Sequence, residues 1–235
     1  MGGVLTEHFG IAVTFLAMGG LNLLAFLIAL FLLPESSRRK AGERYNLSFK
    51  EMGASSMVRG LFSFRVAEAL GRGGISTFLP IFAAALGLST SIIGTLLTIN
   101  ILSVTMFMPL GGLIADRFGR RTLTIIGSVL FAILLATIPL INGFWLLLGV
   151  LLIQGLTSAV SMPASSALAV EEGRKYGMGS TMSMLFLAMS IGMALGPIIS
   201  GGIADLLNID SVFYFGAAIG LTGTALFYWF TRGYR

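Results

Sequence analysis

The sequence has no cysteine and a single histidine, His8, among its 235 residues. The missing cysteines exclude disulfide bonds and thiolate metal sites, and one histidine cannot build a histidine-ligated metal centre. There is also no Gly-x-Ser-x-Gly elbow and no phosphate-binding glycine loop in the chain. We therefore predict that the protein is not an enzyme and that it uses no metal or cofactor.

Charge is scarce as well. Charged residues make up 11% of the chain and hydrophobic residues 56%, with a mean hydropathy of +0.93. No charged residue occurs in 88–115 or in 122–170. A soluble domain of this size does not need so much apolar surface, so the composition predicts a polytopic membrane protein whose partner is the lipid bilayer. The net charge of +5 then reports on membrane orientation and does not predict nucleic-acid binding.

Seven apolar segments are each close to the ~20 residues that a bilayer crossing requires. They span 9–33, 60–87, 89–114, 122–141, 144–169, 178–204 and 211–231. The one long polar stretch is 34–56, and the other connections are short, which predicts that consecutive helices are antiparallel neighbours. The predicted fold is an all-α membrane protein, a helical bundle with seven transmembrane helices.

The basic residues predict the orientation of these helices. Every Lys and Arg except Arg65 and Arg72 falls at the 34–56 linker and its edge, in the loop around 117–121, near 174–175 or at the C-terminus. The opposite connections have no basic residue and contain Glu7, Asp205 and Asp210. The positive-inside rule then places the N-terminus outside and the C-terminus in the cytoplasm, and we expect the plasma (inner) membrane.

A short charged loop, residues 112–121, lies between two long apolar segments. Its order is Gly-x-x-x-Asp-Arg-x-Gly-Arg-Arg, and it resembles the signature loop of the major facilitator superfamily, a large family of secondary transporters. The matching positions are Gly112, Asp116, Arg117, Gly119, Arg120 and Arg121. We call this stretch the signature loop. Gly112 would allow a close approach of helices, and Gly119 would reverse the chain in a left-handed conformation.

The resemblance implies a division of the chain into three parts. Residues 1–33 would be the last helix of an N-terminal half, 34–56 the central cytoplasmic linker, and 57–235 the six-helix C-terminal half. A weak repeat supports this division, since Gly2-Gly3 near the start parallels Gly201-Gly202. Members of the family have about twelve helices, so we expect a truncated chain whose first five helices are missing. A genuine half-transporter is the alternative.

The run of segments two to seven looks most like the drug:proton antiporter branch, including Phe78-Leu79-Pro80 and Gly177-Met178-Gly179-Ser180. The resemblance implies alternating access, in which two halves rock about a central site, driven by a proton or substrate gradient. We expect efflux of a small molecule by proton antiport, while uptake, another coupling ion and the identity of the substrate stay open. The resemblance also implies that the signature loop is a latch, with Asp116 facing a helix N-terminus of the missing N-terminal half. The competing hypothesis is a non-transporting half-unit that assembles with or regulates a partner membrane protein.

Three ionisable residues lie inside the second segment, namely Arg65, Glu68 and Arg72. Their spacing puts them on one helix face, where Glu68 can pair with either arginine. Intramembrane charges are costly and usually mark a pathway or gate, and glycines flank Arg72. We predict Arg72 and Glu68, and with less reason Arg65, as substrate or coupling residues.

Polar and small residues mark two further helix faces. Gln154, Ser158, Ser161 and Ser165 share one face of the fifth segment, and Asn100 is a single polar residue in the third. For Gln154 and Asn100, cavity lining and interhelical hydrogen bonding are both open. In the sixth segment small residues recur at every fourth position from 188 to 204, which predicts a packing surface around Gly192, Gly196, Pro197 and Gly201.

Overall fold

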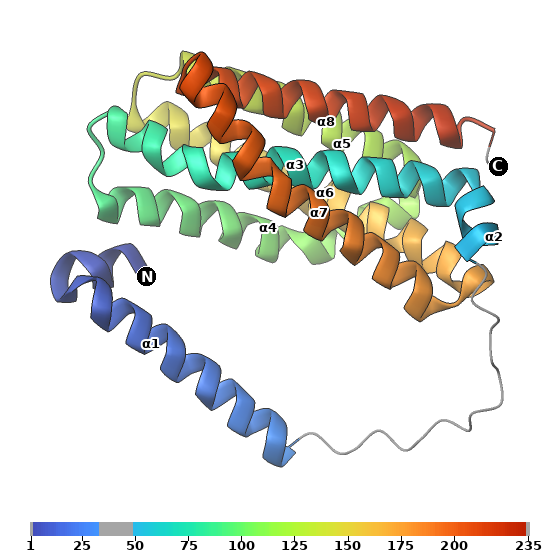
Figure 1. Cartoon of the computed structure of the whole chain (residues 1–235), viewed down its shortest axis with the longest axis horizontal. Coiled ribbons are helices and arrows are strands. Elements are labelled where there is room, and N and C mark those ends of the chain that lie inside the picture. The colour runs from blue at the N-terminus through green and yellow to red at the C-terminus, as the bar shows by residue number, and fades with distance from the viewer. Residues whose placement is uncertain (1, 33–48, 234–235) are drawn as a thin grey trace.

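The computed structural model describes residues 2–32 and 49–233, and these are helical throughout apart from short turns (Figure 1). The elements in chain order are α1 (Gly2–Leu32), α2 (Phe49–Ala54), α3 (Ser56–Ala85), α4 (Thr90–Phe118), α5 (Arg120–Thr137), a 3₁₀ turn (Ile138–Leu140), α6 (Phe144–Tyr176), α7 (Met178–Leu206) and α8 (Ile209–Thr231). Most of the 34–56 linker, with Arg38, Arg39, Lys40 and Arg44, lies outside the described residues.

Each of the seven predicted apolar segments forms a helix, which confirms a polytopic helical membrane protein. Six of the described helices are long and apolar enough to cross a membrane: α1, α4, α5, α6, α7 and α8. By this measure of length and hydropathy, the predicted number of seven membrane-crossing helices exceeds the observed number by one. The exception is α3, which is 30 residues long but whose hydropathy is lowered by Arg59, Arg65, Glu68 and Arg72. The short helix α2 was not predicted.

Local sequence explains where the helices begin and end. The side chains of Ser55, Ser89 and Asn208 accept backbone N–H groups of the first turns of α3, α4 and α8. Gly119 separates α4 from α5 with φ of 92°, and Gly177 separates α6 from α7 with φ of 95°. Such positive φ angles favour glycine, and the chain turns from α4 to α5 at Gly119, although its ψ of 115° lies outside the left-handed helical region that was expected.

Helix α3 is the centre of the bundle and packs mainly against α7 and α8 (Figure 1). Two apolar clusters flank its middle. One gathers around Phe82, Phe213 and Leu135, and the other around Phe64 and Phe227. Residues 65–72 of α3 lie between the two clusters along the helix, and they include the three charged residues predicted for this segment.

The contact between α3 and α7 depends on glycine. A Cβ added to Gly192 would lie 2.5 Å from the Cβ of Ala69 and 2.7 Å from the backbone oxygen of Val66. One added to Gly196 would lie 2.5 Å from the backbone oxygen of Leu70. The predicted small-residue face therefore lets two helix backbones approach closely. A Cβ on Gly201, in contrast, would meet no atom within 4 Å.

Consecutive helices are not always the main packing partners, which differs from the expectation. Helix α4 packs along α6, while its contacts with α3 and α5 are few. The reason lies in small residues, since a Cβ on Gly111 of α4 would collide with the backbone oxygen of Ala159 of α6. A short turn brings two helix ends together, but surface shape decides which helices pack along their length.

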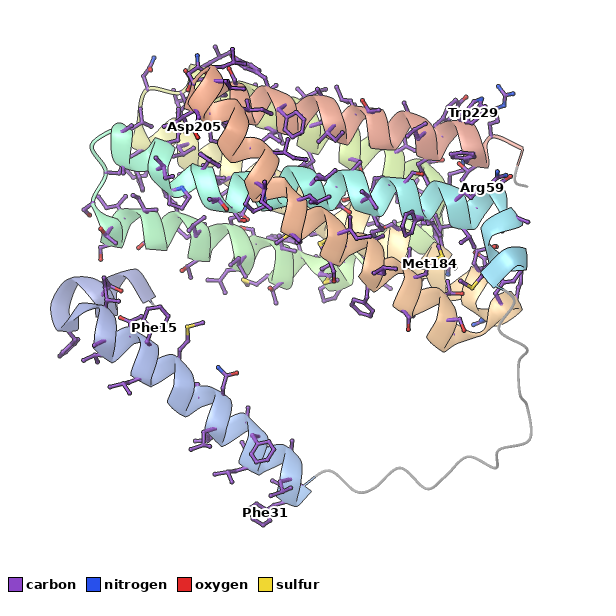
Figure 2. All side chains as sticks on the ribbon, in the orientation of Figure 1. Phe15, Phe31, Arg59, Met184, Asp205 and Trp229 are labelled. Atoms are coloured by element: carbon purple, nitrogen blue, oxygen red, sulfur yellow. The ribbon has the colours of Figure 1, made fainter. Side chains whose placement is uncertain are left out.

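Helix α1 lies to one side of the bundle and contacts α4 (Figure 1). It contains a break at Gly10, with φ of 81°, and its span Phe9–Leu32 is strongly apolar. Its large side chains are exposed, as Phe15 and Phe31 illustrate in Figure 2. This surface requires lipid or further protein to cover it.

Candidate functional site

Arg65, Glu68 and Arg72 form one ion-paired group on α3, which we call the charged cluster. Nη2 of Arg72 donates to Oε1 of Glu68 over 2.9 Å, and Nη1 of Arg65 donates to Oε2 over 3.3 Å. The carboxylate is thus shared between two guanidinium groups. The predicted pairing of Glu68 with either arginine is found with both at once.

Neighbouring helices complete the polar contacts of the cluster. Ser166 of α6 accepts from Arg65 over 3.0 Å, and Ser158 of α6 accepts from Arg72 over 3.3 Å. The guanidinium of Arg72 also lies over the ring of Phe131 of α5, 5.0 Å from its centroid. The cluster therefore joins α3 to both α5 and α6.

Burial makes this cluster costly to the fold. Arg65 is 8% exposed, and the side chains of Glu68 and Arg72 are 14% and 30% exposed. Ion pairs taken out of water regain their desolvation cost only with good geometry and further hydrogen bonds. Nε of Arg72 is buried without a hydrogen-bond partner among the described residues. With two guanidiniums and one carboxylate, the cluster also keeps one excess positive charge.

A small cavity adjoins the carboxylate of Glu68. Its volume is about 20 Å³, close to that of one water molecule, and Ser128, Phe131, Ser161 and Thr224 are among its lining residues. The hydroxyl of Ser128 is buried and unpartnered within the described part of the chain. Polar groups of α3, α5, α6 and α8 therefore meet beside Glu68.

The polar face of α6 points into the bundle. Gln154, Ser158, Ser161 and Ser165 are all buried. Nε2 of Gln154 has no partner among the described residues, whereas Ser158 and Ser161 lie at the cluster and its cavity. Asn100 of α4 donates to the backbone oxygen of Leu151 over 2.7 Å. Asn100 thus makes an interhelical hydrogen bond, and Gln154 is not brought to the charged cluster by any described contact.

The signature loop lies at the end of the bundle where α4 meets α5. Asp116 has 61% of its side chain exposed and accepts from Arg120 over 2.8 Å. Arg120 also reaches Glu171 of α6 at 3.7 Å, and Arg121 donates to Thr231 of α8 over 2.8 Å. Arginines of the loop therefore tie it to the ends of two other helices.

Two other loop residues have no such contacts with the residues that the structure describes. Arg117 is exposed, and a Cβ on Gly112 would meet no atom within 4 Å. The close approach expected at Gly112 occurs instead at its neighbour Gly111, because that residue faces α6.

The sequence alone did not reveal Ser166, Phe131 or Glu172. Glu172 of α6 is 1% exposed; it accepts from Ser55 over 3.0 Å and from Lys175 over 2.8 Å. In the sequence, Glu172 lies in a polar helix end, a pattern that is typical of a solvent-exposed segment. No group of three His, Cys, Asp or Glu side chains suited to a metal ion occurs in the part of the chain that the structure describes.

Residues 61–235 match the profile of the Major Facilitator Superfamily. Because this match covers most of the chain, the chain belongs to that superfamily, which consists of transporters and not enzymes, as the sequence predicts. The helical bundle is thus that of a member of a membrane transporter family.

The chain is also similar to three curated proteins. It is 24% identical to an uncharacterized MFS-type transporter of Methanocaldococcus jannaschii, over 92% of this chain and 58% of that protein. It is 28% identical to the quinolone resistance protein NorA of Staphylococcus aureus, over 65% and 39% of the two chains. It is 27% identical to the multi-drug resistance efflux pump PmrA of Streptococcus pneumoniae, over 58% and 35%. The matches thus cover between a third and three fifths of these relatives.

Proposed function

We propose that residues 57–235 form the C-terminal half of a secondary transporter that exports a small molecule in exchange for protons by alternating access. The observation that carries this proposal is the charged cluster at the middle of α3. Buried ionisable groups in a membrane helix are rare and mark substrate or ion pathways. Glycines at 71, 73 and 74 flank Arg72, as expected where a transporter helix lines its site.

The contacts of the cluster support a role in switching. Glu68 holds two guanidiniums from one helix, and these reach serines of α6 and a ring of α5. A change in the charge or pairing of Glu68 would alter contacts on three helices at once. The names of NorA and PmrA, a quinolone resistance protein and an efflux pump, support export as the direction.

The proposal includes a partner half and a membrane orientation. In it, α1 is the last helix of an N-terminal half, α3 is a seventh membrane crossing, and the signature loop is a cytoplasmic latch against that half. The exposed carboxylate of Asp116 supports the latch, since a partner helix N-terminus could reach it. Asp205 and Arg59 lie at opposite ends of the bundle, which agrees with a non-basic outer face and a basic inner face (Figure 2).

Transport in everted membrane vesicles tests the proposal. The comparison is between this chain and the product of the whole reading frame around its Met1 codon, with a fluorescent quinolone, which carries a carboxylate, as the probe. We expect proton-driven uptake that a protonophore abolishes and that Glu68→Gln weakens, with Arg174→Gln as the matched control on an exposed residue. Insertion without uptake of the probe by either product would favour the non-transporting half-unit.

A further inference from the structure

A groove of about 230 Å³ lies between α6 and α7, with Arg65 of α3 at its base. Its walls include Met162 of α6 together with Met182, Phe186 and Met189 of α7. Phe186 and Met189 are exposed, so the groove is open at the surface of this chain. Methionine is flexible and polarisable and packs well against aromatic groups, so such walls accept apolar ligands of varied shape.

The electrostatics at the base of the groove favour negative charge. Glu68 lies closer to Arg72, at 2.9 Å, than to Arg65, at 3.3 Å, and one carboxylate cannot neutralise two guanidiniums. Two of the five N–H donors of Arg65 find partners among the described residues, on Glu68 and Ser166. A guanidinium in apolar surroundings favours an anion that accepts its remaining donors, and it repels a cation.

We propose that this groove binds a small organic anion, with an apolar or aromatic body against the methionines and Phe186 and one carboxylate or sulfonate on Arg65. The inference names the substrate class of the transporter and so rests on the proposed function. The occupant is a free small molecule and not a lipid, because a groove of about 230 Å³ does not hold the acyl chains of a lipid and Arg65 is among its lining residues. Arg65 then becomes the residue that selects for charge.

The absence of cysteine gives a direct binding assay. Met189→Cys places one thiol in the groove, and Met184→Cys is a matched control on another side of α7, beside Arg59 and Phe230 (Figure 2). The purified chain in nanodiscs of zwitterionic lipid is labelled with a maleimide in the presence of naphthalene-2-sulfonate. The neutral naphthalene-2-sulfonamide and the cationic 2-naphthylmethylammonium serve as probes with the same ring.

We expect the sulfonate to slow labelling of the cysteine at 189 and not of the cysteine at 184. Protection by the sulfonamide should need at least about tenfold more ligand, which is typical of a lost charge-assisted hydrogen bond, and the ammonium should not protect. Arg65→Gln in the Met189→Cys background should weaken protection by a similar factor, Arg65→Lys by less, and Arg174→Gln not at all.

Equal protection by the three probes, or unchanged protection in Arg65→Gln, would overturn the proposal. Protection by phosphatidylglycerol in the nanodisc without added probe would show a lipid site and overturn it as well. If Arg65→Gln does not fold, Phe186→Ala is the second variant, since its exposed side chain should affect affinity and not stability. Binding without transport would overturn the proposed function alone, while transport of cations without sulfonate protection would overturn this inference alone.

Discussion

The carboxylate of Glu172 accepts a hydrogen bond from the hydroxyl of Ser55, 117 residues earlier in the chain, over 3.0 Å. Ser55 is the N-cap of α3, and Glu172 is in the last turns of α6. Lys175 adds a 2.8 Å contact to the other carboxylate oxygen. A buried carboxylate therefore fixes the start of the central helix to α6, at the point where the chain enters the bundle from the linker.

This contact predicts that Glu172→Gln destabilises the bundle. The amide keeps the shape but loses the negative charge that Lys175 and Ser55 share, and a buried charged hydrogen bond contributes about 1.5–3 kcal/mol. The measurement is the free energy of unfolding in detergent micelles. The control is Glu171→Gln, because the side chain of Glu171 is half exposed and lies 3.7 Å from Arg120. This change should lower the free energy of unfolding by less than about 1 kcal/mol. Equal effects of the two changes would contradict the role of Glu172.

Gly192→Ala should lower stability far more than Gly201→Ala, although both lie on α7. A methyl group at 192 would lie 2.5 Å from the Cβ of Ala69 and near rigid backbone atoms of α3, whereas one at 201 meets nothing within 4 Å. Overpacking of a tight contact costs about 1–3 kcal/mol, while an open helix position gains slightly from alanine. Thermal unfolding in micelles measures both, and a neutral Gly192→Ala would contradict a tight contact between α3 and α7 at this residue.

The sequence predicts the helices and the charged cluster because both depend on short-range spacing. Apolar segments of about twenty residues and charges at spacings of three and four are visible without tertiary structure. Ser166, Phe131 and Glu172 were missed because their roles come from partners more than fifty residues away in the chain. The sequence likewise does not distinguish Gly111 from Gly112, because only the packing of α4 decides which of the two glycines faces α6.

The orientation of the chain is the third prediction. Thr122→Cys and Asn142→Cys place single thiols on exposed residues at the two ends of α5 and its 3₁₀ turn, in a chain without native cysteine. A membrane-impermeant maleimide applied to intact cells should label the cysteine at 142 and not the one at 122, because the basic loop is expected inside. After lysis both should react. Labelling of both in intact cells would overturn the orientation.

Asp116→Asn should change conformational balance and leave folding almost unaffected. Its pair with Arg120 is exposed, so the loss of stability should be below about 1 kcal/mol. If the carboxylate also meets a helix N-terminus of the other half in one state, its loss should shift the two states by several-fold. Transport, and the rate at which an external maleimide labels the cysteine at 142, measure this shift. Unchanged values of both would contradict the latch.

The charged cluster supports the last prediction, which concerns Glu68 and Arg72. Replacing Glu68 with Gln leaves two unneutralised guanidiniums, whereas Arg72→Gln leaves a neutral Arg65–Glu68 pair. Removing one member of a buried ion pair costs about 3–5 kcal/mol, and the partial exposure of Arg72 reduces this. We therefore expect Glu68→Gln to lower stability more than Arg72→Gln does.

The double variant Glu68→Gln, Arg72→Gln restores the single excess positive charge of the native cluster, so its stability should lie above that of Glu68→Gln. Measurements of transport should distinguish a functional role of Arg72 from a purely structural one. Arg72→Gln should insert normally yet lose most transport, because its contacts with Glu68, Ser158 and Phe131 join three helices. Arg72→Lys should recover little. A lysine keeps the charge, but it lacks the planar guanidinium that contacts Oε1 of Glu68, the hydroxyl of Ser158 and the ring of Phe131. Normal transport by Arg72→Gln would reduce Arg72 to a structural anchor, and additive losses in the double variant would show that the two residues act independently.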